Sequence, residues 1–126
     1  MLVMILGSSR ERRGLRLGQE YSRCLVREHV HEVILTKETG GPGSVIDRVA
    51  YLGFVRIENS GVVLVGDHVL WRGRALGRIA GFDGTHAPNH LNLVVTCTDE
   101  CGDGISLGAR LLDPIVFSQA GSNHED

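Results

Sequence analysis

The sequence predicts an all-β protein, a small closed or partly open β-barrel of short antiparallel strands with room for one minor helix. Runs rich in Val, Leu and Ile alternate with glycine-containing turns, most clearly over residues 61–95, which is hairpin chemistry. The 126 residues include 17 Gly but only 3 Phe, 2 Tyr and 1 Trp, a composition typical of many tight turns. At 42% hydrophobic and 22% charged, the chain is ordinary for a globular protein and long enough to bury one core.

The first half of the chain is expected to contain three strands. Apolar, β-branched stretches predict them at 2–6, 30–36 and 45–57, with Gly53 as a candidate bulge. Tyr21, Leu25 and His29 recur at helical spacing, which predicts one or two helical turns over 21–28. The segment 10–18 is predicted to be a basic loop or a poorly specified extended segment, and the Gly- and Pro-rich segment 38–44 a second loop.

The second half predicts shorter strands, at 62–65, 68–72, 75–82 and 90–96, followed by ordered segments at 105–112 and 115–117. An acidic loop is expected at 98–104. Segments 63–69 and 105–111 share the pattern apolar-x-apolar-Gly-x-x-apolar, in which the glycine is expected at a sharp turn with positive φ. The repeat favours closure into a barrel. Residues 1–117 form the single predicted domain, and 118–126 a flexible tail.

Composition excludes some functions. The N-terminal apolar run is too short for a membrane span or a signal segment, so the default location is the cytoplasm. A net charge of -2 argues against nucleic-acid binding. Residues 1–27 carry six Arg and two Glu, whereas residues 97–126 carry six acidic residues and one Arg. The basic N-terminal segment and the acidic C-terminal segment can contact each other within one fold or between the subunits of a homo-oligomer. The cysteines Cys24, Cys97 and Cys101 are expected to be reduced thiols.

The loop 83–90 is the main candidate site because it gathers ionisable and polar residues between apolar strands. We predict a small-molecule or anionic ligand here, with binding residues His68, Arg78, Asp83, His86, Asn89 and His90. A metal site is the alternative, in which zinc is held by Asp83, His86, His90, Cys97 and Cys101. No other cofactor is predicted. The plain structural alternative is that Asp83 and Asn89 cap the turn while both histidines are partly exposed.

Three further clusters have mainly structural interpretations. Arg10, Arg12, Arg13 and Arg16 suit a phosphate or carboxylate partner, but a solvated arm that pairs with the acidic C-terminal region is preferred. Asp99, Glu100 and Asp103 fit a solvated loop better than a cation site. His29 and His31 near Cys24 suit ordinary surface positions, with phosphoryl acceptance as the alternative. The sequence contains no nucleophile elbow, Walker motif or dinucleotide fingerprint.

One family shares this layout. The segments of this chain that match the family are the turn Gly66-Asp67-His68-Val69, the strand 75–81, the segment 89–93 and the closing segment 105–108. Through these, residues 61–117 resemble the later half of the glucitol/sorbitol-specific IIA component of the bacterial sugar phosphotransferase system. The resemblance implies a small bacterial β-barrel. It also implies a histidine phosphoryl acceptor after a Cys-containing segment, comparable to Cys24 and His29 here. We expect a binding or assembly module rather than an enzyme, and the alternative is a phosphoryl-accepting or metal-dependent component.

Overall fold

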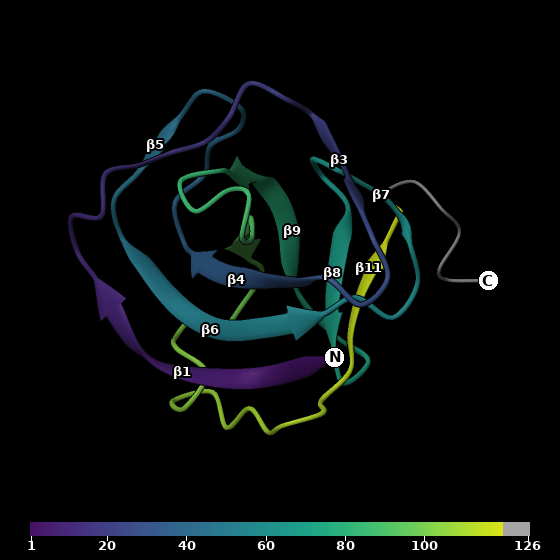
Figure 1. The fold of residues 1–126 in the computed structure, drawn as a ribbon. Coiled ribbons are helices and arrows are strands. Elements are labelled where there is room, and N and C mark those ends of the chain that lie inside the picture. Colours follow the sequence, from purple (N-terminus) through teal and green to yellow (C-terminus); the bar gives the residue numbers. More distant parts are fainter. Residues whose placement is uncertain (120–126) are drawn as a thin grey trace.

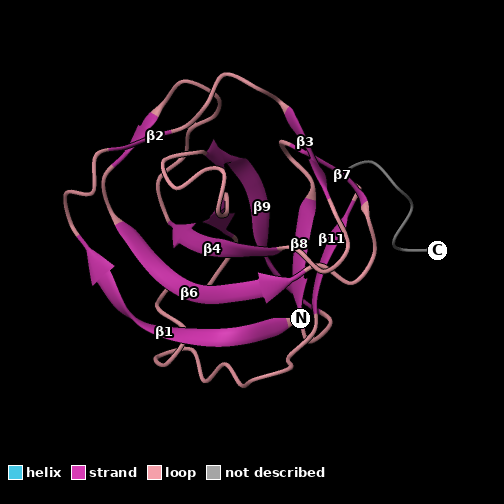
Figure 2. Cartoon of the chain, viewed as in Figure 1, coloured by secondary structure: helices cyan, strands magenta, loops and turns pink. Residues whose placement is uncertain are grey.

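Strands and loops, without a helix, make up residues 1–119, the part of the chain that the computed structural model describes (Figures 1 and 2). In the N-terminal half the strands are β1 (Leu2–Arg10), β2 (Leu15–Arg16), β3 (Ser22–Leu25), β4 (Val30–Thr36), β5 (Val45–Ile46) and β6 (Val49–Arg56). They continue as β7 (Gly61–Leu64), β8 (His68–Trp71), β9 (Arg74–Asp83), β10 (Asn92–Cys97) and β11 (Ile115–Ser118). The all-β prediction is therefore confirmed, and no helix of the described part could span a membrane.

One seven-stranded sheet dominates, in the order β1-β6-β4-β10-β9-β8-β11. The remaining strands form two small pairs, β2 with β5 and β3 with β7. The prediction of purely antiparallel strands is wrong, because β4 and β10 pair in parallel, with Glu32 opposite Asn92 and Leu35 opposite Val95. Turn residues in a sequence predict only the antiparallel pairing of two strands that follow each other along the chain. A pairing between segments 55 or more residues apart leaves no such local signal.

The sheet curves, and its two edge strands approach each other at one end (Figure 1). Leu2 donates its N–H to the carbonyl of Asp113 at 2.9 Å, and Leu112 donates to the carbonyl of Leu2 at 2.7 Å. On the other side, Arg72 donates to the carbonyl of Pro114 at 3.1 Å. The segment that precedes β11 thus connects β1 to β8, and β1 and β11 are the edges of the sheet.

Both faces of the central strands are buried, because side chains alternate between faces along a strand. One face contributes the larger apolar cluster, which contains Leu2, Leu25, Val33, Leu35, Leu52, Val55, Ile57, Val63, Val69, Trp71, Leu76, Ile79, Phe82, Leu91, Leu93 and Val95. The other face contributes a smaller cluster of Leu15, Leu17, Ile34, Ile46, Val49, Ala80 and Val94. The β2–β5 pair supplies part of this second cluster, so it covers the second face.

The element predictions of the first half are confirmed where the pattern is strongest. The strand at 30–36 is β4 with the same bounds. Gly53 lies at register shifts against both β1 and β4, as expected of a bulge. A Cβ at this position would collide with the carbonyl oxygen of Met4, so β1 can approach this closely only because the residue is glycine.

The helix predicted at 21–28 is wrong. Residues Ser22–Leu25 form β3 and pair with β7, and a turn follows in which His29 donates to the carbonyl of Val26 at 3.0 Å. Three residues at helical spacing do not outweigh the burial of Leu25 in the main apolar cluster. The basic segment 10–18 follows the extended alternative in part, because it contributes to β1 and β2.

The ordered segment predicted at 105–112 consists mainly of turns. Gly66 and Gly108 do share positive φ values of 94° and 76°, as the repeated pattern predicts, but only the first copy is flanked by strands. The second copy follows the edge of β1, where Ile105 donates to the carbonyl of Leu6 at 3.1 Å. The predicted tail begins within β11, and its residues 120–126 lie outside the described part.

The prediction of reduced thiols is wrong for two of the three cysteines. Cys97 and Cys101 form a disulfide, because the turn after β10 brings their Cα atoms to 5.7 Å, within the range a disulfide bridges. Cys24 is a free, exposed thiol. In the arginine segment, Arg16 Nη1 donates to the carbonyl of Gly43 at 3.2 Å and Gly14 donates to Asp47 Oδ1 at 3.1 Å. Its pairing with the acidic C-terminal region stays a prediction, because Glu125 and Asp126 lie outside the described residues.

Candidate functional site

A row of four residues crosses the sheet at the level of the loop 84–91. Asn92 on β10 lies opposite Asp83 on β9 and opposite Glu32 on β4, and Glu32 lies opposite Phe54 on β6. Directly opposed residues in a sheet project their side chains to the same face. Glu32 and Asn92 each stand two residues before a member of the smaller apolar cluster, so the row lies on that face. We call these four residues the polar row.

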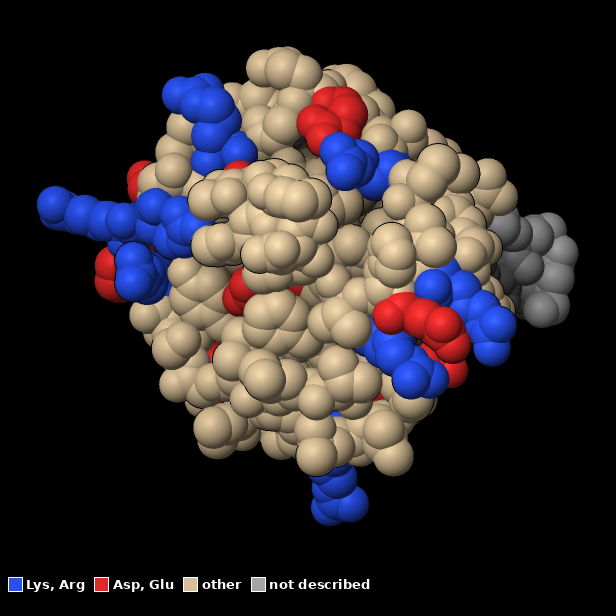
Figure 3. All heavy atoms as spheres, in the orientation of Figure 1, with Lys and Arg blue, Asp and Glu red and all other residues tan. Residues whose placement is uncertain are grey.

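The three polar members of the polar row are buried. The residues Asp83, Glu32 and Asn92 are 7%, 8% and 1% exposed. Asn92 Nδ2 donates to Asp83 Oδ2 at 2.8 Å, and Thr85 Oγ1 donates to Asp83 Oδ1 at 2.8 Å. The Asp83 carboxylate therefore joins the end of β9 to the start of β10 and to the loop. In the view of Figure 3, acidic atoms lie recessed among uncharged ones over β4.

The loop closes over the row with two stacked histidines. Asn89 and His90 both donate backbone N–H groups to the carbonyl of His86, at 3.0 and 3.3 Å, and the Ala87–Pro88 peptide bond is cis. The rings of His86 and His90 stack at 5.0 Å between centroids. The Phe54 ring meets His90 edge-on at 5.1 Å, so His90 packs between the loop and the sheet.

Glu32 and His90 face each other at the closed end of the site. His90 Nε2 lies 3.7 Å from Glu32 Oε1. Burial raises the pKa of Glu32, opposed by the charges of His86 and Arg13, whereas burial lowers the pKa of His90, and His86 lowers it further. Both shifts disfavour charge on these two groups. The contact is an ion pair only when His90 is protonated and Glu32 is ionised, and burial opposes both.

Two buried polar atoms in this site have no hydrogen-bond partner within residues 1–119, and they are His90 Nε2 and Asn92 Oδ1. A buried polar atom without a partner costs roughly 1–3 kcal/mol of stability. Such atoms are rare in folded proteins and call for an explanation. Chemically, the amide oxygen accepts a hydrogen bond, and the imidazole nitrogen donates or accepts one according to its tautomer.

His31 lies next to this site but projects to the opposite face, into the larger apolar cluster. Its Nδ1 accepts a hydrogen bond from the Leu91 N–H at 3.0 Å, so the neutral ring carries its proton on Nε2. Burial lowers the pKa of His31, with further lowering by His29, His90 and Arg23. His29 is exposed, and its ring lies edge-on to His31 at 6.4 Å. Of the two candidate phosphoryl acceptors, only His29 is accessible.

The structure brings together only some of the residues of the predicted ligand site. Asp83, His86 and His90 come together with the polar row, and Asn89 lies exposed on the same loop. His68 lies opposite Arg78, and Arg78 lies opposite Thr96, well down β9 and β10 from Asp83. These two residues therefore do not join the loop. Figure 3 shows the basic side chains of this view gathered mostly toward its margins.

The predicted zinc set is likewise not assembled. Cys97 ends β10, at the opposite end from Asn92, and its sulfur is bonded to Cys101. Among the described residues no group of three or more His, Cys, Asp or Glu side chains is placed to hold a metal ion.

Sequence reasoning missed Glu32, Asn92 and Phe54. Each polar member interrupts an apolar strand, in the runs Val-His-Glu-Val-Ile-Leu and Leu-Asn-Leu-Val-Val. A polar residue inside a buried strand is an informative signal, because charged and amide side chains are seldom buried without a purpose. The polar residues within these apolar strands could be recognised from the sequence, but the pairing of β4 with β10 could not.

These features define a class: an all-β protein built on one mixed sheet, with a buried polar row closed by a single loop. The chain belongs to DUF6917, a family of unknown function, whose model matches residues 1–118. No curated protein and no solved structure matches the chain.

Proposed function

We propose that this protein is a binding module whose small polar ligand is held by the polar row when the loop 84–91 opens. The observation that carries the proposal is the Asn92 amide oxygen, which is 1% exposed and lacks a hydrogen-bond partner. The partnerless His90 Nε2 and the buried Glu32 carboxyl stand beside it. A ligand with both donor and acceptor groups satisfies these atoms together.

The loop is suited to act as a cover. Residues 84–89 are exposed, whereas Leu91 at its end is 6% exposed and anchored by its hydrogen bond to His31. The His90 ring reaches the sheet through packing against Phe54 and His86 rather than through a hydrogen bond from Nε2. Opening the loop therefore exposes the polar row without breaking a strand pairing. The curved sheet serves as a partly open barrel that holds the row in place.

Native mass spectrometry of protein purified without denaturation tests this proposal. We expect a mass above that of the chain alone, which acid denaturation releases and which the double variant His86→Ala/His90→Ala lacks. The variant should keep the native circular dichroism spectrum. His68→Ala is the matched control, because His68 lies away from the loop, and it should retain the added mass.

The same spectra separate the alternatives. An excess equal to one zinc ion supports the metal interpretation, and a phosphate mass lost in His29→Ala supports phosphoryl acceptance. A bare chain mass for the wild-type protein, combined with loss of folding in the double variant, would show that the loop is structural. The spectra also report whether the protein is a homo-oligomer, as its opposed charges suggest.

A further inference from the structure

The polar row offers acceptor oxygens to an occupant. Asp83 already accepts hydrogen bonds from Asn92 and Thr85. Asn92 uses its amide nitrogen for that bond, and its oxygen, Oδ1, is buried without a partner within residues 1–119. The Glu32 carboxyl oxygen Oε1 lies 3.7 Å from His90 Nε2, which is beyond hydrogen-bond distance. What these two oxygens lack is a hydrogen-bond donor.

The neighbour of Asn92 fixes which end of its amide is left over. The amide nitrogen faces the Asp83 carboxylate at 2.8 Å, and the reverse orientation would place two acceptor oxygens against each other. Asp83 on β9 and Glu32 on β4 lie on opposite sides of Asn92. Turning the nitrogen toward β9 turns the oxygen toward β4. Asn92 Oδ1 and the Glu32 carboxyl therefore form one group of acceptors.

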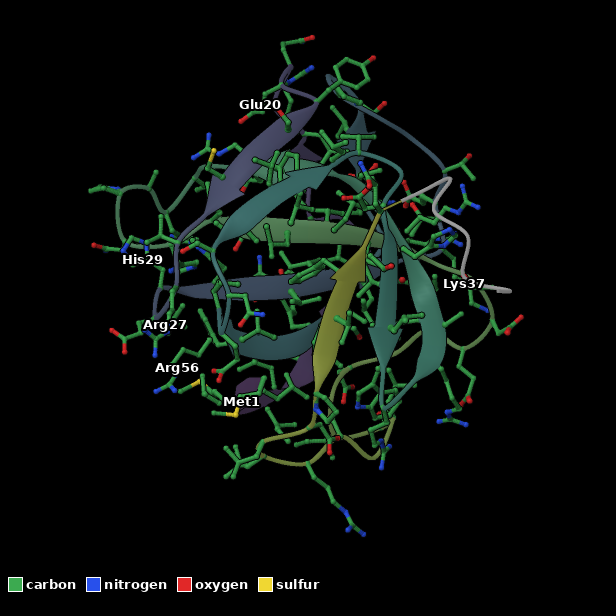
Figure 4. The ribbon with its side chains drawn as sticks, turned by 90° about the vertical axis from the view of Figure 1, so that its right-hand side faces the viewer. Met1, Glu20, Arg27, His29, Lys37 and Arg56 are labelled. Atoms are coloured by element: carbon green, nitrogen blue, oxygen red, sulfur yellow. A yellow bond between two sulfur atoms is a disulfide. The ribbon has the colours of Figure 1, made fainter. Side chains whose placement is uncertain are left out.

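The carboxyl groups of the polar row differ from the surface charges of this protein. Figure 4 shows four labelled charged side chains at the outer margins of the molecule, where solvated charges normally lie: Glu20, Arg27, Lys37 and Arg56. The carboxyls of Asp83 and Glu32 are instead buried. An anionic group between them would place like charges close together in a poorly solvated site. The row therefore disfavours an anion.

A cation removes the unfavourable state of Glu32. Burial raises the pKa of this carboxyl, and the charges of His86 and Arg13 oppose that effect only in part. An opposite charge within a few ångströms favours the ionised form. A positive group that reaches Glu32 therefore gains a carboxylate partner, and it gains more when it also donates a hydrogen bond.

An aromatic ring continues the row beyond Glu32. Phe54 on β6 lies directly opposite Glu32, and its ring meets the His90 ring edge-on at 5.1 Å. Aromatic rings attract cations at short range. Asn92 Oδ1, the Glu32 carboxyl and the Phe54 ring thus follow one another across three adjacent strands, and each of them suits a positively charged donor.

We propose that the ligand of the polar row is a small primary amine whose ammonium group donates hydrogen bonds to Asn92 Oδ1 and the Glu32 carboxylate. The inference rests on the proposed function, because the loop 84–91 has to open to admit the amine. An ammonium carries three N–H donors, so the third reaches His90 Nε2 when that nitrogen is unprotonated. Where Glu32 is protonated before binding, its proton passes to water as the ammonium enters.

A nuclear magnetic resonance titration of the full chain, labelled with nitrogen-15, tests the proposal at pH 7.5 and constant salt. The four probes are butylammonium, butanol, tetramethylammonium and butyrate. Butanol lacks the charge, tetramethylammonium lacks the N–H donors, and butyrate has the opposite charge. We expect butylammonium to shift the Asn92 side-chain amide signals saturably. Butanol and tetramethylammonium should bind at least about tenfold more weakly, since each loses a charge-assisted hydrogen bond, and butyrate should not bind.

A matched pair of variants tests the role of Glu32. Glu32→Gln keeps the size and one acceptor oxygen but removes the charge, so it should weaken butylammonium binding about tenfold and leave butanol binding unchanged. Glu100→Gln removes an exposed charge beyond the other end of β10, and it should bind butylammonium like the wild-type protein. The amide spectra of both variants report whether they keep the native fold.

A further probe distinguishes the sources of the ammonium group. Lysine blocked at both backbone ends carries the same butylammonium group as its side chain. Because the loop closes over the row, we expect this bulkier probe to bind more weakly than the free amine. Tighter binding of the blocked lysine would identify a protein side chain as the source and overturn the small-amine part of the proposal.

Four results would overturn the proposal as a whole. They are binding of butanol or butyrate as tight as that of butylammonium, equally tight binding of tetramethylammonium, equal weakening in Glu32→Gln and Glu100→Gln, or no shift with any probe. The last result indicates that water alone fills the row. The mass excess that depends on His86 and His90 judges the proposed function separately. If that excess is present and butyrate binds best, the binding module stands and the amine does not.

Discussion

The two faces of β4 and β10 handle burial in different ways. On one face Val33, Leu35, Leu93 and Val95 continue the larger apolar cluster without interruption. On the other face Ile34 and Val94 continue the smaller cluster, but Glu32 and Asn92 stand two residues before them. The first face is built for stability. The second face buries a carboxyl group and an amide at the end that the loop covers, which costs stability. Buried polar groups of this kind are expected at a functional site.

The largest effect should come from the apolar face. Leu93 is 0% exposed, and Leu93→Ala removes buried methyl groups and leaves a cavity, for an expected loss of about 2–5 kcal/mol. Urea unfolding monitored by the fluorescence of Trp71, the single tryptophan, measures it. Leu111→Ala, at a position 63% exposed, is the control and should stay within about 0.5 kcal/mol of the wild type. Equal losses in the two variants would contradict the assignment of the main core.

A smaller loss is expected from the polar row. Asn92→Ala leaves the Asp83 carboxylate buried without the 2.8 Å hydrogen bond from Asn92, at a cost of about 1–3 kcal/mol. Asn89→Ala, on the exposed part of the loop, should change stability by less than about 0.5 kcal/mol. The same urea experiment compares them. If Asn92→Ala were as stable as the wild type, the polar row would contribute nothing to the fold and the contrast between the faces would fail.

The smallest effect is a pH dependence. Because burial raises the pKa of Glu32 in the folded state above the ordinary value of 4.5, its contribution to stability is present below pH 4.5 and is lost as pH rises through the folded-state pKa. Glu32→Gln remains uncharged, so it should be more stable than the wild type at pH 7, and the difference should disappear toward pH 4.

Urea midpoints measured between pH 4 and 7 test this sign. Both proteins keep His31 and His90, so the direct titrations of these rings largely cancel in the difference. Glu11→Gln, at an exposed position, serves as the control. A wild-type protein more stable than Glu32→Gln at pH 7 would show that Glu32 is held as a stabilising carboxylate, opposite to its predicted role.

Local patterns predicted much of the fold. The strand at 30–36, the bulge at Gly53 and the positive φ of Gly66 and Gly108 all follow from side-chain and backbone preferences of a few adjacent residues. The helix predicted at 21–28 failed because its short pattern carries little energy, and the ordered segment at 105–112 forms turns. Pairing of β3 with β7, and of the 105–112 segment with the edge of β1, decided both.

The candidate site was only half predictable. Asp83, His86 and His90 stand together in the sequence, so their concentration was visible there. Glu32 and Phe54 come from other strands, and they reach the loop only through the parallel pairing of β4 with β10 and the antiparallel pairing of β4 with β6. His68 and Arg78 are close in sequence to the loop, yet the extended geometry of β9 carries them away from it.

By itself the sequence determined that this chain forms strands, where it turns, and which loop is rich in ionisable side chains, because those properties depend on neighbours along the chain. Only the tertiary structure decided that two distant strands run parallel and that Glu32 and Asn92 meet under His90. These outcomes depend on which buried surfaces fit together across the whole sheet, and no local preference encodes that choice.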